Sequence, residues 1–116
     1  NLGIGAVSGI KIDDSMVAVP RKKDGLTAML RLGTVIYVPE LDKKFLVADL
    51  KSSRFNGSQQ IDFATSGMKS QIEPGYNKPF KGIIIIREGL GKEDARNYVQ
   101  SGEWDKEKLM PFDNGS

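Results

Sequence analysis

Apolar residues in this chain fall into short runs separated by glycine, proline and polar residues. Runs of β-branched and aromatic residues of this length, bounded by turn-forming residues, are typical of β-strands. We predict five strands, over residues 16–19, 33–38, 45–49, 61–64 and 81–87. Pro39 ends the second strand, and a turn at Asp42 makes a hairpin of the second and third. The last strand contains four consecutive isoleucines, which favours a central strand rather than a helix.

Towards the C-terminus the apolar spacing changes from that of strands to that of helices. Glu93 and Asp94 lie where a first helical turn favours acidic residues, and Gly102 follows where helices commonly end. Trp104 to Leu109 could form another helical turn, and we expect Trp104 and Leu109 to pack against the preceding strands. We therefore divide the chain into a β domain over residues 1–88 and a packed helical extension over residues 89–116.

Two of the predicted strands carry a lone aspartate, Asp49 at the end of one and Asp62 inside another. Aspartate is disfavoured in strands, and burying its charge is costly, so both positions need an explanation. One explanation is an acid/base pair at the mouth of a small barrel. The other is that each carboxylate accepts backbone N–H groups and so caps a turn. The residues by themselves leave both explanations open.

Composition excludes several kinds of site. The 116 residues carry a net charge of +2, and their basic residues are scattered apart from residues 21–23, so we expect no nucleic-acid partner. There is no cysteine and no histidine, which excludes thiol nucleophiles, disulfides and the commonest metal ligands. Any acid/base chemistry therefore falls to Asp, Glu, Lys or Tyr, and we expect neither a metal nor a cofactor.

Nothing in the hydropathy pattern predicts a membrane anchor. No apolar run reaches the roughly 20 residues that a transmembrane helix needs. The chain begins with Asn1 rather than Met, which fits a mature secreted product or a shortened chain.

Five segments of the chain resemble, in order, the sequence pattern of the 3D domain, a small double-psi β-barrel named for three aspartates. That pattern runs T-A-[ST]-G, V-I-A-V-D-P, I-P-L-G-T-x-V-Y-V-P, V-A-D-T-G-G-x-I-K-G and R-I-D-L-[YF]. The similar segments here are AVSG at 6–9, MVAVP at 16–20, LGTVIYVP at 32–39, VAD at 47–49 with NG at 56–57, and QIDF at 60–63. The resemblance covers about residues 6–87 and is tightest at 33–39 and 61–63.

The resemblance implies a mostly β fold, a six-stranded double-psi β-barrel followed by the short helical extension. It also implies lytic transglycosylase activity on peptidoglycan, in which one carboxyl group protonates the glycosidic oxygen and the sugar's own 6-hydroxyl attacks. Asp62 would be the acid/base and Asp49 its charged neighbour. Where the family has its first aspartate this chain has Pro20, and Asp24 in the following insertion is the candidate replacement. A peptidoglycan partner implies a secreted or cell-envelope protein, and we expect a monomer.

A non-catalytic alternative is a polysaccharide-binding barrel, because similar expansin-like barrels contact polysaccharide with little or no cleavage. Tyr37, Phe55 and Tyr76 would then be stacking platforms, although packing at the core or rim is favoured for each ring. Arg54 would stand in for the lysine that the family pattern carries in this region. A third possibility, a protein-interaction barrel, is supported only by the versatility of the fold.

Overall fold

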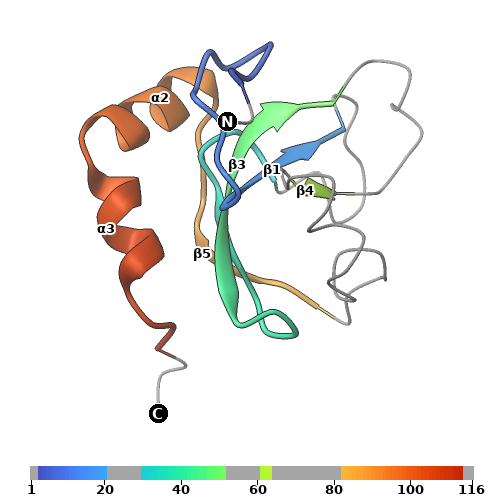
Figure 1. Cartoon of the computed structure of the whole chain (residues 1–116), viewed down its shortest axis with the longest axis vertical. Helices are drawn as coiled ribbons and strands as arrows, with labels where there is room; N and C mark the ends of the chain where they lie inside the picture. Colours follow the sequence, from blue (N-terminus) through green and yellow to red (C-terminus); the bar gives the residue numbers. More distant parts are fainter. Residues whose placement is uncertain (1–2, 21–29, 52–60, 64–81, 114–116) are drawn as a thin grey trace.

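The computed structural model describes residues 3–20, 30–51, 61–63 and 82–113. In these ranges five strands form one mixed sheet, and two helices follow at the C-terminal end (Figure 1). The strands are β1 (Met16–Val19), β2 (Val35–Val38), β3 (Lys43–Leu50), β4 (Asp62–Phe63) and β5 (Ile84–Arg87), and the helices are α2 (Lys92–Gln100) and α3 (Glu103–Leu109). The prediction of a mostly β chain with a short C-terminal helical extension is confirmed, whereas the six-stranded barrel stays a prediction.

Neighbouring strands in the sheet follow the order β4-β1-β3-β2-β5. β2 and β3 form the predicted antiparallel hairpin, and its turn holds Asp42 in the left-handed region at φ 47°. β1 runs parallel to β3, while β4 and β5 are antiparallel to β1 and β2, respectively. The sheet is therefore mixed, with its one parallel pair among the described strands at β1 and β3.

Among the described strands, the isoleucine-rich strand β5 lies at one end of this order and not at its centre, where the sequence predicts it. Ile83, Ile85 and Ile86 are half-buried against the core, whereas the side chain of Ile84 is 42% exposed. A run of isoleucines indicates a strand that contacts the core, but it does not indicate how many neighbouring strands pair with that strand.

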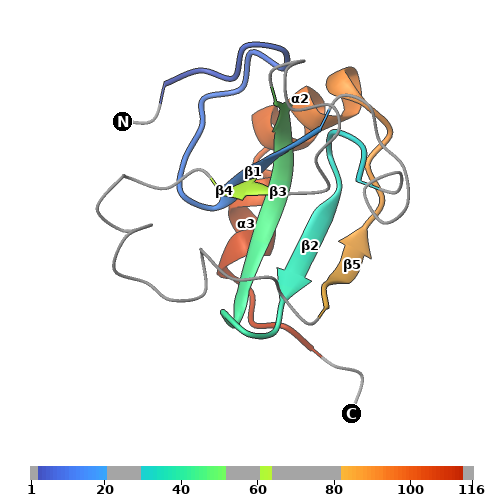
Figure 2. The same ribbon diagram turned by 90° about the vertical axis from the view of Figure 1, so that its right-hand side faces the viewer.

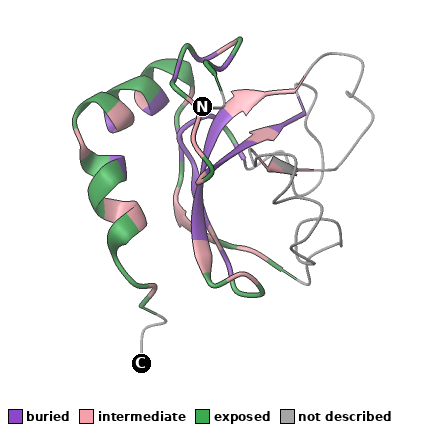
Figure 3. Cartoon of the chain, in the orientation of Figure 1, coloured by how far each residue is buried: buried purple, intermediate pink, exposed green. Residues whose placement is uncertain are grey.

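Most of the core comes from β1, β2 and β3, and the helices add Ala95, Tyr98 and Trp104. The packing of Trp104 is confirmed, whereas the side chain of Leu109 is 81% exposed, so the prediction that Leu109 packs against the strands is wrong. Both helices lie on the same face of the sheet (Figure 2), with their buried residues towards it and their exposed residues outward (Figure 3). Gly102 lies between the helices at φ 85°, a left-handed conformation that suits the predicted closing glycine. Neither helix is long and apolar enough to cross a membrane, nor is any other helix in the described ranges.

Gly89, two residues beyond β5, lies directly against the turn that leads into β2. A Cβ atom at this position would lie 2.2 Å from the Thr34 nitrogen and 2.3 Å from the Leu32 carbonyl oxygen. Because both are backbone atoms, no side-chain rotation can relieve the contact. The Gly89 N–H also donates to Thr34 Oγ1 at 3.0 Å. Glycine therefore permits the close approach that joins β5 and α2 to the start of β2.

We predict that Gly89→Ala lowers the free energy of unfolding by about 2–3 kcal/mol, because the added methyl group forces these backbones apart. Urea denaturation followed by circular dichroism measures the change. Gly82→Ala is the matched control, since a Cβ atom there meets no atom within 4 Å. Its effect should stay within about 0.5 kcal/mol. Equal losses in the two variants would contradict this account of Gly89.

Candidate functional site

An irregularity in the parallel pair determines where Asp49 lies. Val17 pairs with Val47, but the next residue of β1, Ala18, pairs with Asp49, so Ala48 is an extra residue in β3. Such a bulge re-aims the side chains that follow it in the strand. Without the extra residue Ala18 would pair with Ala48, and Asp49 would move one position along the sheet to its opposite face.

On its other side, Ala18 pairs with Asp62 of β4. The backbones of Asp49 and Asp62 thus flank Ala18 in a single row across three strands, which we call the Ala18 row. At a strand spacing of about 4.8 Å their Cα atoms lie about 10 Å apart. The sheet therefore brings together the two strand aspartates that the sequence singled out. The side chain of Asp62 lies outside the described part of the structure.

The carboxylate of Asp49 is bound by three consecutive backbone N–H groups near the N-terminus. Ala6 donates to Oδ2 at 3.0 Å, and Val7 and Ser8 donate to Oδ1 at 3.0 and 3.3 Å. These donors belong to one helical turn, closed by a bond from the Gly9 N–H to the Gly5 carbonyl at 2.9 Å. The first N–H groups of a helical turn have no partner within it, and here Asp49 supplies one. This geometry matches the structural explanation of Asp49, a carboxylate that caps a turn.

Residues 5–9, which we call the N-terminal turn, are shaped to receive this carboxylate. A Cβ atom on Gly5 would lie 2.6 Å from Ser8 Oγ and 2.9 Å from Asp49 Cγ, so the close approach requires glycine. Ser8 is fully buried, and its Oγ accepts the Ile10 N–H at 3.1 Å. Hydrogen bonds to a charged acceptor contribute about 1.5–3 kcal/mol each, so the turn is firmly attached. The sequence predicts this capping role as one of two explanations for Asp49, but it does not identify residues 5–9 as the source of the N–H groups, although Gly5 and Gly9, spaced by one helical turn, were the available signal.

Tyr37, a predicted stacking platform, is engaged within the chain. Its ring stacks on that of Phe112, with centroids 4.0 Å apart and planes 7° apart. Its hydroxyl donates to Asp42 Oδ1 at 2.5 Å, and this bond is the main reason that the Tyr37 pKa is raised. One face of the ring is therefore covered by the C-terminal segment, as expected for packing at the rim.

Four other predicted site residues, Asp24, Arg54, Phe55 and Tyr76, lie outside the described residues. In the ranges that the structure describes, no three acidic side chains come close enough together to hold a metal ion.

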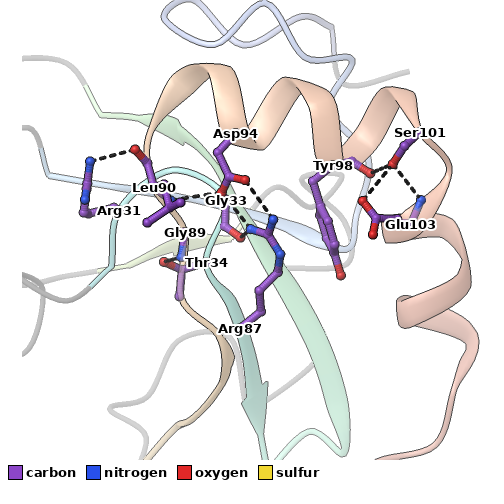
Figure 4. A network of polar contacts seen from close by, with 10 residues as sticks. All are labelled: Arg31, Gly33, Thr34, Arg87, Gly89, Leu90, Asp94, Tyr98, Ser101 and Glu103. Carbon is purple, nitrogen blue, oxygen red and sulfur yellow. Dashed lines mark hydrogen bonds and ion pairs between the residues drawn. The ribbon is translucent and has the colours of Figure 1, made fainter.

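A second polar cluster joins α2 to the sheet (Figure 4). Arg87 donates from Nη1 and Nη2 to the two carboxylate oxygens of Asp94, each at 2.8 Å, and from Nη1 to the Gly33 carbonyl at 2.9 Å. Its guanidinium carbon lies 4.0 Å from the centre of the Tyr98 ring. The Leu90 N–H also donates to Asp94, at 3.0 Å. The cluster therefore links β5, the start of β2 and the first turn of α2.

Shifted pKa values in this cluster follow from these contacts. The bond from Arg87 lowers the pKa of Asp94, outweighing the opposing effect of burial, and the same bond raises the pKa of Arg87. Burial is the main reason that the pKa of Tyr98 is raised. Shifted values often mark reactive sites, but here the acid and base are paired with each other. We interpret the cluster as a structural contact that attaches α2 to the sheet.

Comparisons of the chain with protein-family models, with curated proteins and with solved structures find no match in any of the three. The resemblance to the 3D domain therefore remains a prediction from the sequence motifs.

We predict that Asp94→Asn lowers the free energy of unfolding by about 2 kcal/mol at neutral pH, because Arg87 loses its charged partner. The Asp94 pKa lies below its ordinary value of 3.8 in the folded chain. Its stabilising effect is therefore fully present above about pH 4 and is lost as the pH falls through the folded-state pKa. Urea denaturation at pH 7, 5 and 3 should show the two stabilities converging at the lowest pH.

Glu93→Gln is the control for this experiment, because Glu93 is an exposed acid in the same helical turn. A difference between wild type and Asp94→Asn that stays constant down to pH 3 would contradict the role of the ion pair.

Proposed function

We propose that this chain is a peptidoglycan-cleaving domain of the lytic transglycosylase kind, with Asp62 as its acid/base. The observation that carries the proposal is the Ala18 row, in which the bulge at Ala48 sets Asp49 in line with Asp62. The motifs that resemble the 3D domain contain these two aspartates. Because peptidoglycan lies outside the cytoplasm, the proposal includes a secreted or cell-envelope location.

One carboxyl group is sufficient for this reaction. Asp62 in its protonated form would donate to the glycosidic oxygen as the bond from that oxygen to the anomeric carbon breaks. The resulting carboxylate would then take the proton of the sugar's 6-hydroxyl as its oxygen bonds to the anomeric carbon, giving a 1,6-anhydro end. No water is consumed, and Asp62 returns to its starting state.

The hydrogen bonds already made by the Asp49 carboxylate favour the lytic transglycosylase reaction over hydrolysis. Glycoside hydrolysis ordinarily requires a second carboxyl group, either as nucleophile or to activate water. The Asp49 oxygens already accept three backbone N–H groups, which makes this carboxylate a poor candidate for either task. An intramolecular attack by the sugar removes the need for it.

The proposed fold is the six-stranded double-psi barrel. Closing the sheet would bring together β4 and β5, which lie at opposite ends of the described strand order. The parallel pairing of β1 and β3 within an otherwise antiparallel sheet supports a topology more complex than a meander.

A second candidate is a non-catalytic polysaccharide-binding barrel. The capped state of Asp49 favours it, because a residue that the resemblance assigns to chemistry has a structural role here. Cleavage assays separate the two candidates directly.

We predict that the wild-type chain releases soluble fragments with 1,6-anhydro ends from purified peptidoglycan, and that Asp62→Asn lowers the rate at least about 100-fold. Mass spectrometry of the released fragments measures both quantities. Asp105→Asn is the matched control, since Asp105 is an exposed residue of α3, and its rate should be unchanged.

Equal rates for wild type and Asp62→Asn would remove Asp62 from the mechanism. Fragments with reducing ends would indicate hydrolysis instead. Absence of cleavage by the wild type, together with cosedimentation with peptidoglycan, would favour the binding module.

A further inference from the structure

The position of Asp62 depends on β1. The described residues of β4 are Asp62 and Phe63, and they pair with Ala18 and Val17 of β1. Within the described part of the chain β1 is the neighbour of β4 in the sheet, so the placement of these two residues follows that of β1. Any contact that fixes β1 near Ala18 therefore also fixes the backbone of Asp62.

The N-terminal turn makes such a contact. It belongs to the segment that leads into β1, and it is bound to the end of β3 through the Asp49 carboxylate. Asp49 is itself the register partner of Ala18. The turn is joined to the rest of its segment by a bond from the Gly5 N–H to the Ile10 carbonyl at 2.8 Å, and Ile10 is buried in the core. The turn therefore connects the segment that precedes β1 with β3, beside the Ala18 row.

We infer that the N-terminal turn sets the position of Asp62, and that Asp49 and Gly5 are positioning residues of the proposed reaction. The inference rests on the function proposed above. It replaces the role of Asp49 as a charged neighbour of the acid with that of a hydrogen-bond acceptor for the turn. It also adds Gly5, a residue with no chemistry of its own, to the residues on which the site depends.

Gly5 makes the inference testable without a change of charge. Gly5→Ala keeps the Asp49 carboxylate but places a methyl group against Ser8 Oγ and Asp49 Cγ. Asp49→Asn removes the charge and puts an NH2 group, which cannot accept a hydrogen bond, where Oδ2 accepts from Ala6. If Asp49 acts through the turn, the two variants should behave alike. If it acts through its charge, only Asp49→Asn should alter the titration of the acid.

The experiment compares wild type, Gly5→Ala, Asp49→Asn and the control Gly82→Ala, each checked for folding by circular dichroism. NMR hydrogen exchange measures the backbone amides of Ala6 to Ser8 and of β4, and peptidoglycan cleavage is followed against pH. We expect both site variants to exchange these amides at least about tenfold faster than wild type and Gly82→Ala. We expect kcat to fall about 10- to 100-fold in both, with the midpoints of the pH profile unchanged.

Unchanged exchange of the β4 amides in both site variants would overturn the inference, whatever the cleavage rates. A pH profile displaced in Asp49→Asn but not in Gly5→Ala would also overturn it, because Asp49 would then act through its charge. If the wild type fails to cleave peptidoglycan, the proposed reaction fails. The exchange rates then still decide whether the turn sets the position of β4.

Discussion

A carboxylate at the end of a buried strand has to be supplied with hydrogen-bond donors, and most of the structure around Asp49 follows from that requirement. β3 is buried along its central residues, and its next-to-last residue, Asp49, carries a charge that the sheet itself does not satisfy. Three N–H groups from the N-terminal turn satisfy it. This contact joins residues about forty positions apart and fixes the start of the chain against the strand that crosses the middle of the sheet. The same contact leaves little of Asp49 free for chemistry.

Ion pairs also attach the C-terminal helices to the sheet. The Lys44 side chain is only 7% exposed, and its ammonium donates to the Glu107 carboxylate at 2.5 Å and to the Glu107 carbonyl at 3.2 Å. A buried ammonium without acceptors would cost several kcal/mol, so α3 has to lie over β3 at this point. The carbonyl belongs to the last turn of α3, where the helix dipole favours a cation. Arg87 and Asp94 make the equivalent connection between β5 and α2.

Local chemistry explains why much of the fold was predictable. Strand formation in β1, β2 and β3 follows from β-branched and aromatic runs, and the end of β2 follows from Pro39. Gly102 marked the break between the helices in the same way. The position of β5 was not predictable from its isoleucines, because composition does not encode strand order. The bulge at Ala48 was also hidden, since one extra apolar residue inside an apolar run leaves no periodic signal.

The features that could not be predicted depend on contacts between residues that are far apart in the sequence. Asp49 and Asp62 look alike in the sequence, each an acid in an apolar strand, and the sequence motifs assign them to one reaction. Asp49 accepts three N–H groups from residues 6–8, and the sequence gives no means of pairing those residues with residue 49.

A carboxylate that accepts three N–H groups would have to break those bonds before it could take up a proton or attack a carbon atom. That cost is added to the barrier of any reaction that uses it, whereas a carboxyl group without such donors carries no such cost. Asp49 is therefore poorly suited to chemistry, and under the proposed function the acid/base role falls to Asp62. The N-terminal turn gives Asp49 a structural role instead, as the acceptor that holds the start of the chain against β3.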